Sequence, residues 1–133
     1  MSISMLIRLF LALIAILFVA FGLWSISDPI GMTSQLGVTV GGPSAAFEMR
    51  GVFGGVSLGA ATLTAAGAIN PSRFQRPALY FLLAYMGGYT LSRLISLILG
   101  DSATSSGWIF AGFEVLSFLL AGLALRASNR PQA

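Results

Sequence analysis

Two charged residues of this sequence lie inside long apolar stretches. Arg93 comes six residues before Leu99, where one apolar helix is expected to end, and Glu114 comes six residues after Trp108, where another is expected to begin. At a rise of 1.5 Å per residue, both lie about 9 Å from the same end of their helices. A charge left in hydrocarbon costs about 2.5 to 3.5 kcal/mol on insertion scales. The spacing therefore predicts an intramembrane ion pair between Arg93 and Glu114.

This pair has a structural and a chemical interpretation. A buried ion pair can fix the register of two helices and contribute specificity instead of stability. In the chemical interpretation, Glu114 is the candidate catalytic residue, a general acid or base, and Arg93 anchors a carboxylate or phosphate. Since a buried ionisable residue in a membrane is a functional-site candidate by default, both interpretations stay open.

Further polar residues extend the possible site. At 100° per residue, a stripe within an arc of about 100° leads from Arg93 toward the middle of its helix, and in lipid it must face protein or trapped water. Glu48 and Arg50 are two residues apart, about 200° around a helix, and are not expected to pair with each other. Together with Asp101, Arg93 and Glu114 they are five charges that we expect to converge on one end of the bundle. The candidate ligand-binding residues are Glu48, Arg50, Tyr85, Tyr89, Arg93 and Glu114; Ser92 and Ser96 complete the stripe.

The elements that position these residues are membrane-spanning helices. The 133 residues are 56% hydrophobic and 8% charged, with a mean hydropathy of +0.91, unlike a soluble domain. A span needs about 20 apolar residues, so four spans fill the chain as a single domain, residues 1–133. We predict an all-α, up-down bundle of four transmembrane helices, at about residues 5–26, 46–69, 77–99 and 108–125. The first run is long for a signal peptide and lacks an A-x-A cleavage site.

The connections follow from capping and proline rules. Asp28 can cap a short interfacial helix that begins at Pro29 and ends at Gly37, in the first outer loop. The polar stretch 70–76 is predicted to be a tight turn, after which Pro77 opens the third helix.

Small residues on the second helix predict close packing. Gly51, Gly55 and Gly59 share one side at four-residue spacing, the pattern of close helix approach in membranes. Gly54, Ser57 and Ala61 add small residues on another side. We expect this helix to touch more than one helix, or a second subunit.

Charge and composition limit the function classes. The chain has no Cys and no His, which excludes zinc sites built from those residues, a His-ligated haem and disulfides, and we expect no metal and no cofactor. The few, dispersed arginines do not predict nucleic-acid binding. Five of them flank the ends that an even number of spans places on one side, so the positive-inside rule predicts cytoplasmic N- and C-termini. These are Arg8, Arg73, Arg76, Arg126 and Arg130.

Three stretches together carry a family resemblance. They are residues 47–55, where Glu48-x-Arg50 precedes a glycine-rich segment, residues 87–101 with Arg93, and Phe113-Glu114. The sequence resembles a bacterial family of small four-helix membrane proteins that is classed as a domain of unknown function. The resemblance covers nearly the whole chain and implies a place in the bacterial cytoplasmic (inner) membrane, without an established activity.

Three function hypotheses follow. The first is an accessory or binding membrane protein whose charged outer pocket holds an amphiphilic or anionic small molecule, or which packs against membrane lipid, a larger membrane protein or a second copy. The second is a small membrane enzyme, an isomerase or hydrolase of a lipophilic substrate, in which Glu114 moves a proton while Tyr89 and Arg93 polarise the substrate. The third is an oligomeric transporter or channel, suggested by the glycine face. Whether the chain is an enzyme stays open.

Overall fold

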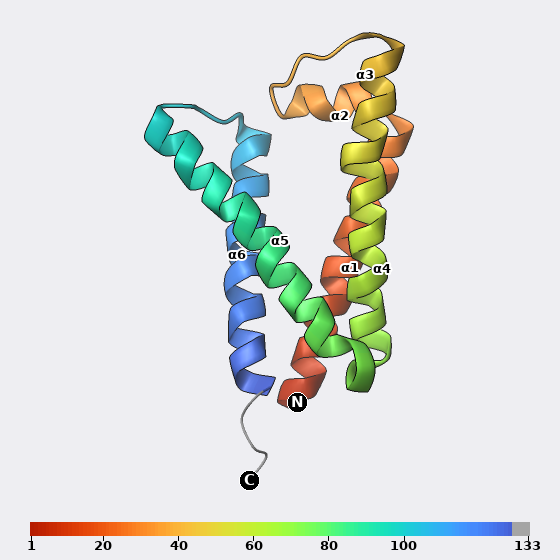
Figure 1. Cartoon of the computed structure of the whole chain (residues 1–133), viewed down its shortest axis with the longest axis vertical. Helices are drawn as coiled ribbons and strands as arrows, with labels where there is room; N and C mark the ends of the chain where they lie inside the picture. The colour runs from red at the N-terminus through yellow and green to blue at the C-terminus, as the bar shows by residue number, and fades with distance from the viewer. Residues whose placement is uncertain (129–133) are drawn as a thin grey trace.

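The computed structural model describes residues 1–128, which form helices joined by short loops, with no strand in this part of the chain. Four helical segments are long and apolar enough to cross a membrane: Ile3–Ser27, Gly42–Ile69, Pro71–Leu99 and Ser105–Ser128. They run up and down in chain order (Figure 1). The chain is therefore a multi-pass membrane protein, and the predicted all-α fold with four long apolar helices is confirmed.

The first span is the single helix α1 (Ile3–Ser27), which the Ser2 side chain caps by accepting a hydrogen bond from Met5 N. The second span consists of α3 (Gly42–Met49), the π-helix η1 (Arg50–Gly55) and α4 (Val56–Ile69). The sequence pattern predicts one regular helix from residue 46 instead. The wider π turn coincides with a segment in which three of six residues are glycine, so few side chains resist it.

A short helix, α2 (Pro29–Gln35), lies between the first two spans, as predicted. Asp28 Oδ1 accepts a hydrogen bond from Gly31 N at 2.9 Å, and Gly37 ends the turn with a positive φ of 77°. Met32 and Thr33 are fully buried, so α2 packs down onto the bundle. We call this end of the molecule the α2 end, and the opposite end, where α1 begins and α6 ends in Figure 1, the terminal end.

The third and fourth spans are α5 (Pro71–Leu99) and α6 (Ser105–Ser128). The prediction of a turn over 70–76 with Pro77 opening the helix is wrong, because α5 begins at Pro71 and contains Pro77. Pro71 takes the first helical position, where a missing N–H costs nothing. Pro77 removes the N–H that would bond to the carbonyl of Arg73, and both residues are exposed, so that carbonyl can be solvated.

The tightest packing lies toward the terminal end. Gly67 of α4 lies so close to α5 that a Cβ there would come within 2.7 Å of Ala78 Cβ. From this crossing α5 leans away from α1 and α4 as it approaches the α2 end, accompanied by α6 (Figure 1). The fully buried large side chains of the core include Leu11, Leu79, Leu82 and Met86.

The glycines that contact α1 are not the predicted ones. Gly51 and Gly59 have nothing within 4 Å of an added Cβ, and Gly55 meets only a backbone oxygen of η1. Gly54 lies against α1 instead, where its Cβ would come within 2.6 Å of Ile26 Cγ1. The side with Gly54, Ser57 and Ala61 therefore faces α1. The second span contacts both α1 and α5, as predicted, but the face with Gly51, Gly55 and Gly59 meets no other helix of the described residues.

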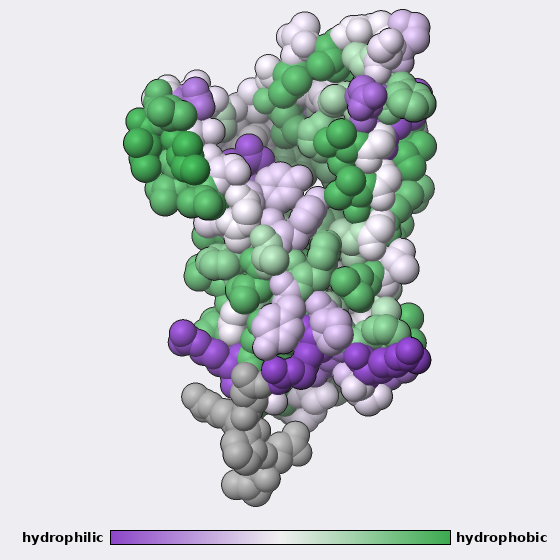
Figure 2. Space-filling model, viewed as in Figure 1, coloured by the Kyte–Doolittle hydropathy of each residue, from purple (hydrophilic) through white to green (hydrophobic). Residues whose placement is uncertain are grey.

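A belt of hydrophilic residues crosses the visible face of the molecule at the terminal end (Figure 2). Its arginines lie at the start of α1, the start of α5 and the last turn of α6, and Arg8 Nε donates to the carbonyl of Ala68 at 2.9 Å. Arg130, which belongs to the same sequence pattern, lies outside the described residues. The described members are Arg8, Arg73, Arg76 and Arg126.

Candidate functional site

The divergence of α5 and α6 from α1 leaves a cavity of about 390 Å³ in the half of the bundle nearest α2. Side chains from α1, η1, α4, α5 and α6 line it, and Leu36, which directly follows α2, contributes from above. Thr104 Oγ1 donates to the Gln35 carbonyl at 2.9 Å and thereby ties the end of α2 to the loop before α6. The lining residues are Leu17, Phe18, Ala20, Phe21, Trp24, Leu36, Val52, Phe53, Ser57, Tyr85, Met86, Tyr89, Arg93, Ile109, Phe110, Phe113 and Glu114.

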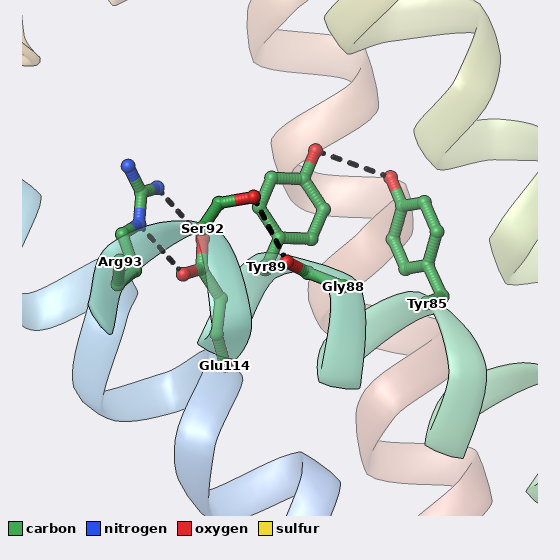
Figure 3. A network of polar contacts seen from close by, with 6 residues as sticks. All are labelled: Tyr85, Gly88, Tyr89, Ser92, Arg93 and Glu114. Carbon is green, nitrogen blue, oxygen red and sulfur yellow. Dashed lines mark hydrogen bonds and ion pairs between the residues drawn. The ribbon is translucent and has the colours of Figure 1, made fainter. Parts of the chain in front are cut away.

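Arg93 and Glu114 form a two-point contact at one side of this cavity (Figure 3). Arg93 Nε lies 2.9 Å from Glu114 Oε2, and Arg93 Nη2 lies 2.9 Å from Glu114 Oε1. This parallel geometry is the strong form of an arginine–carboxylate pair. The Glu114 side chain is 8% exposed and that of Arg93 is 44% exposed, so the carboxylate lies deeper than the guanidinium.

Two tyrosines continue the polar chain from Arg93 along α5. The Arg93 guanidinium lies 5.9 Å from the centre of the Tyr89 ring, within cation–π range. The Tyr89 and Tyr85 hydroxyls are 3.5 Å apart, and the two rings meet edge to face (Figure 3). The other residues of the predicted stripe do not line the cavity: Ser92 is exposed, with its Oγ donating to the Gly88 carbonyl, and Ser96 is half-buried. The stripe therefore lines the cavity with Tyr85, Tyr89 and Arg93.

The rest of the wall is aromatic, a feature that the sequence analysis missed. Phe21 packs edge to face against Phe53 of η1 and Phe110 of α6, with ring centres 6.2 and 5.2 Å apart. A signal was present in the sequence: Phe18, Phe21 and Trp24 recur every third residue in α1, as Phe110 and Phe113 do in α6. Such spacing places aromatic rings on one helix face.

The structure does not bring Glu48 and Arg50 to Arg93 and Glu114. Both are exposed and line a separate hollow of about 800 Å³ beside η1, and Arg50 Nε donates to the Ile26 carbonyl at 2.9 Å. That carbonyl belongs to the last turn of α1, where helix carbonyls lack intrahelical partners and attract cations. Asp101 lies exposed in the loop after α5. These charges therefore lie toward the α2 end, as predicted, but Glu48, Arg50 and Asp101 do not join Arg93 and Glu114 in one site, as the list of candidate ligand-binding residues had implied for Glu48 and Arg50.

The geometry limits what the cavity can do. Its charged lining residues, within the described part of the chain, are Arg93 and Glu114, and they neutralise each other. Residues 1–128 contain no group of three or more Asp, Glu, His or Cys side chains placed to hold a metal ion. The arrangement suits an amphiphile, because a few polar groups at one side face apolar, mostly aromatic walls.

Fold and cavity together define a small all-helical multi-pass membrane protein with a polar site between its spans. The chain belongs to the family described as Domain of unknown function (DUF4345), whose model matches residues 6–125. No curated protein and no solved structure matches the chain.

Proposed function

We propose that this protein is a non-catalytic binding protein that holds a membrane amphiphile in the cavity between α1, η1, α5 and α6. One observation carries the proposal: the cavity is apolar over most of its wall and polar at the side where Arg93, Tyr89 and Tyr85 lie. A head group would bind there while its chain lies among phenylalanine rings. Ligand sites commonly combine such walls with a few polar groups.

Access from the side of the bundle supports this proposal. Figure 2 shows the surface hollowed between the upper part of α5 and the α3–η1 segment, with polar residues in the hollow. Most α5 residues beyond Arg93 are exposed and apolar, among them Leu94, Ile98 and Leu99. A lipophile that lies among the acyl chains of the membrane lipids can therefore reach the cavity without crossing water.

Orientation is part of the same proposal. The arginine belt at the terminal end favours cytoplasmic termini by the positive-inside rule, in a bacterial inner membrane. The α2 end then faces outward, and the Arg93–Glu114 pair lies within the membrane near the outer leaflet. Reporter fusions at the C-terminus and in the 36–41 loop test this orientation: activity of a cytoplasm-specific reporter in the loop would contradict it.

The enzyme hypothesis finds less support in this geometry. Both Glu114 oxygens accept hydrogen bonds from Arg93, and the carboxylate is almost fully covered. A general acid or base must reach the reacting proton of its substrate directly or through one water. Glu114 would have to leave Arg93 first, so a role in positioning Arg93 is the simpler one.

The test is purification in native lipid followed by mass spectrometry of bound small molecules. The wild type should carry a defined lipophile at near-stoichiometric amount. Ala20→Phe fills the cavity from α1, whereas Val19→Phe adds similar bulk to the neighbouring residue, which is exposed and does not line the cavity. The lipophile should be lost from Ala20→Phe and kept by Val19→Phe. Equal retention by both variants, or no lipophile in the wild type, would overturn the proposal.

A further inference from the structure

The charge balance of the cavity selects against ionic head groups. An anion placed on Arg93 would lie beside the Glu114 carboxylate, which already occupies Arg93 Nε and Nη2. A cation would have to compete with Arg93 for a carboxylate whose two oxygens are both engaged. Since burying an unpaired charge is costly, the pair favours a ligand whose head carries no net charge.

The polar groups left over in the cavity can all donate a hydrogen bond. Arg93 Nη1 has no hydrogen-bond partner among residues 1–128, and guanidinium groups donate only. Of the Tyr85 and Tyr89 hydroxyls, one can donate to the other, which leaves one O–H for a ligand. Ser57 lines the cavity, is almost fully buried, and makes no hydrogen bond within the described residues. A head group rich in acceptors, such as carbonyl oxygens, satisfies these donors.

The walls suit a flat ring. Phe21, Phe53 and Phe110 form an edge-to-face cluster in the wall, and Tyr85, which also lines the cavity, stacks on Phe81 with ring centres 5.2 Å apart. A cavity of about 150 Å³ holds one benzene ring, so 390 Å³ leaves room for a substituted ring and the start of a chain.

We infer that the cavity binds a neutral lipophile whose planar ring bears carbonyl oxygens, the chemistry of a prenylated quinone. The ring lies among the aromatic walls, one carbonyl oxygen accepts from Arg93 Nη1 and the other accepts from the Tyr89 hydroxyl, and the apolar chain leaves through the open side of the bundle. This inference rests on the proposed function and narrows its ligand. Glu114 acts here as a positioning residue that fixes the Arg93 guanidinium and cancels its charge.

Trp24 provides the measurement, because it lines the cavity whereas Trp108, at the start of α6, does not. In the Trp108→Phe variant, reconstituted into nanodiscs, decylubiquinone should quench Trp24 fluorescence along a saturable curve. Dibromostearate, an anionic quencher, should give only the linear collisional quenching of a probe dissolved in lipid. Ala20→Phe should abolish the saturable part of the decylubiquinone curve, whereas Val19→Phe should keep it.

Tyr89→Phe removes the hydroxyl that donates a hydrogen bond to the ligand and keeps the aromatic ring. It should weaken decylubiquinone binding about 5- to 10-fold. Tyr80→Phe is the matched control, because the Tyr80 hydroxyl accepts from Arg76 Nη2 outside the cavity and its loss should leave the affinity unchanged.

The outcomes separate the inference from the proposed function. Saturable quenching by dibromostearate alone, or tighter binding of dibromostearate than of decylubiquinone, overturns the neutral-ring inference and leaves amphiphile binding standing. If neither probe saturates and native purification yields no lipophile, both fail. An unchanged decylubiquinone affinity in Tyr89→Phe also contradicts the inference, because the tyrosine donor then plays no part.

Discussion

The two halves of this bundle use the same four spans and pack them in opposite ways. At the terminal end, Gly67 and Ala78 let α4 and α5 come so close that no room is left for a methyl group on Gly67. Leu11 and Leu79 are fully buried between the helices there. At the α2 end, phenylalanine and tyrosine rings stand between α1 and the α5–α6 pair, and a cavity remains among them. The size of the side chains at each level therefore determines whether the helices close or stay apart.

The largest expected effect lies in the closed half. Leu79→Ala should lower the free energy of unfolding by about 2–5 kcal/mol, because Leu79 is fully buried and the helices around it have little room to collapse. Phe113→Ala, at the cavity wall, removes more atoms and should nevertheless cost less. The measurement is reversible unfolding in mixed micelles. Leu116→Ala, on the exposed face of α6, is the control and should change little. A larger loss for Phe113→Ala than for Leu79→Ala would contradict the contrast between the halves.

The second largest loss of stability is expected when the ion pair is broken. Glu114→Ala leaves Arg93 without its partner and should cost about 1–3 kcal/mol, below the value for a fully buried pair, since the guanidinium is partly exposed. Glu48→Ala, an exposed carboxylate outside the cavity, should change stability by less than about 0.5 kcal/mol.

A charge swap sharpens the same point. Exchanging Arg93→Glu with Glu114→Arg should recover part of the stability that either single change loses, because the opposite charges still face each other. Amphiphile binding should not recover, because the arginine that donates to the ligand would then be at position 114 in α6 instead of position 93 in α5. Recovery of both properties would make the pair purely structural.

The two glycine faces of the second span predict a smaller contrast. Gly54→Ala should cost about 1–2 kcal/mol, because the new Cβ meets Ile26 at 2.6 Å. Gly51→Ala meets nothing within 4 Å and should be neutral or stabilise the helix by up to about 1 kcal/mol. Thermal denaturation of the two variants, with the oligomeric state recorded, checks this. Dissociation of a wild-type oligomer by Gly51→Ala would show that a second copy covers the open face.

Much of the fold was accessible from the sequence because it depends on local rules. Hydropathy located the four spans, and the Asp28-Pro29 pair located the start of α2. The equal depth of Arg93 and Glu114 follows from helical rise alone, and the structure places their side chains 2.9 Å apart.

The features that were missed depend on how the helices cross. Which glycine face meets α1 depends on the rotation that η1 introduces, and a regular 100° step cannot represent a π turn. Arg50 turns to the Ile26 carbonyl because α1 ends beside it, which no local pattern encodes. The aromatic cavity wall needs three helices at known angles. Both Pro71 and Pro77 could open a helix, and the sequence alone did not show that α5 begins at Pro71 and continues through Pro77.

Nuclear Overhauser contacts between the protein in nanodiscs and a lipophile retained from native membranes test the central claim most directly. The account predicts contacts from ligand protons to the ring protons of Tyr85 and Phe113 and to the Ser57 side chain, all of which line the cavity. Contacts confined to the exposed faces of the bundle, such as Leu13 of α1 and Leu116 of α6, would contradict it.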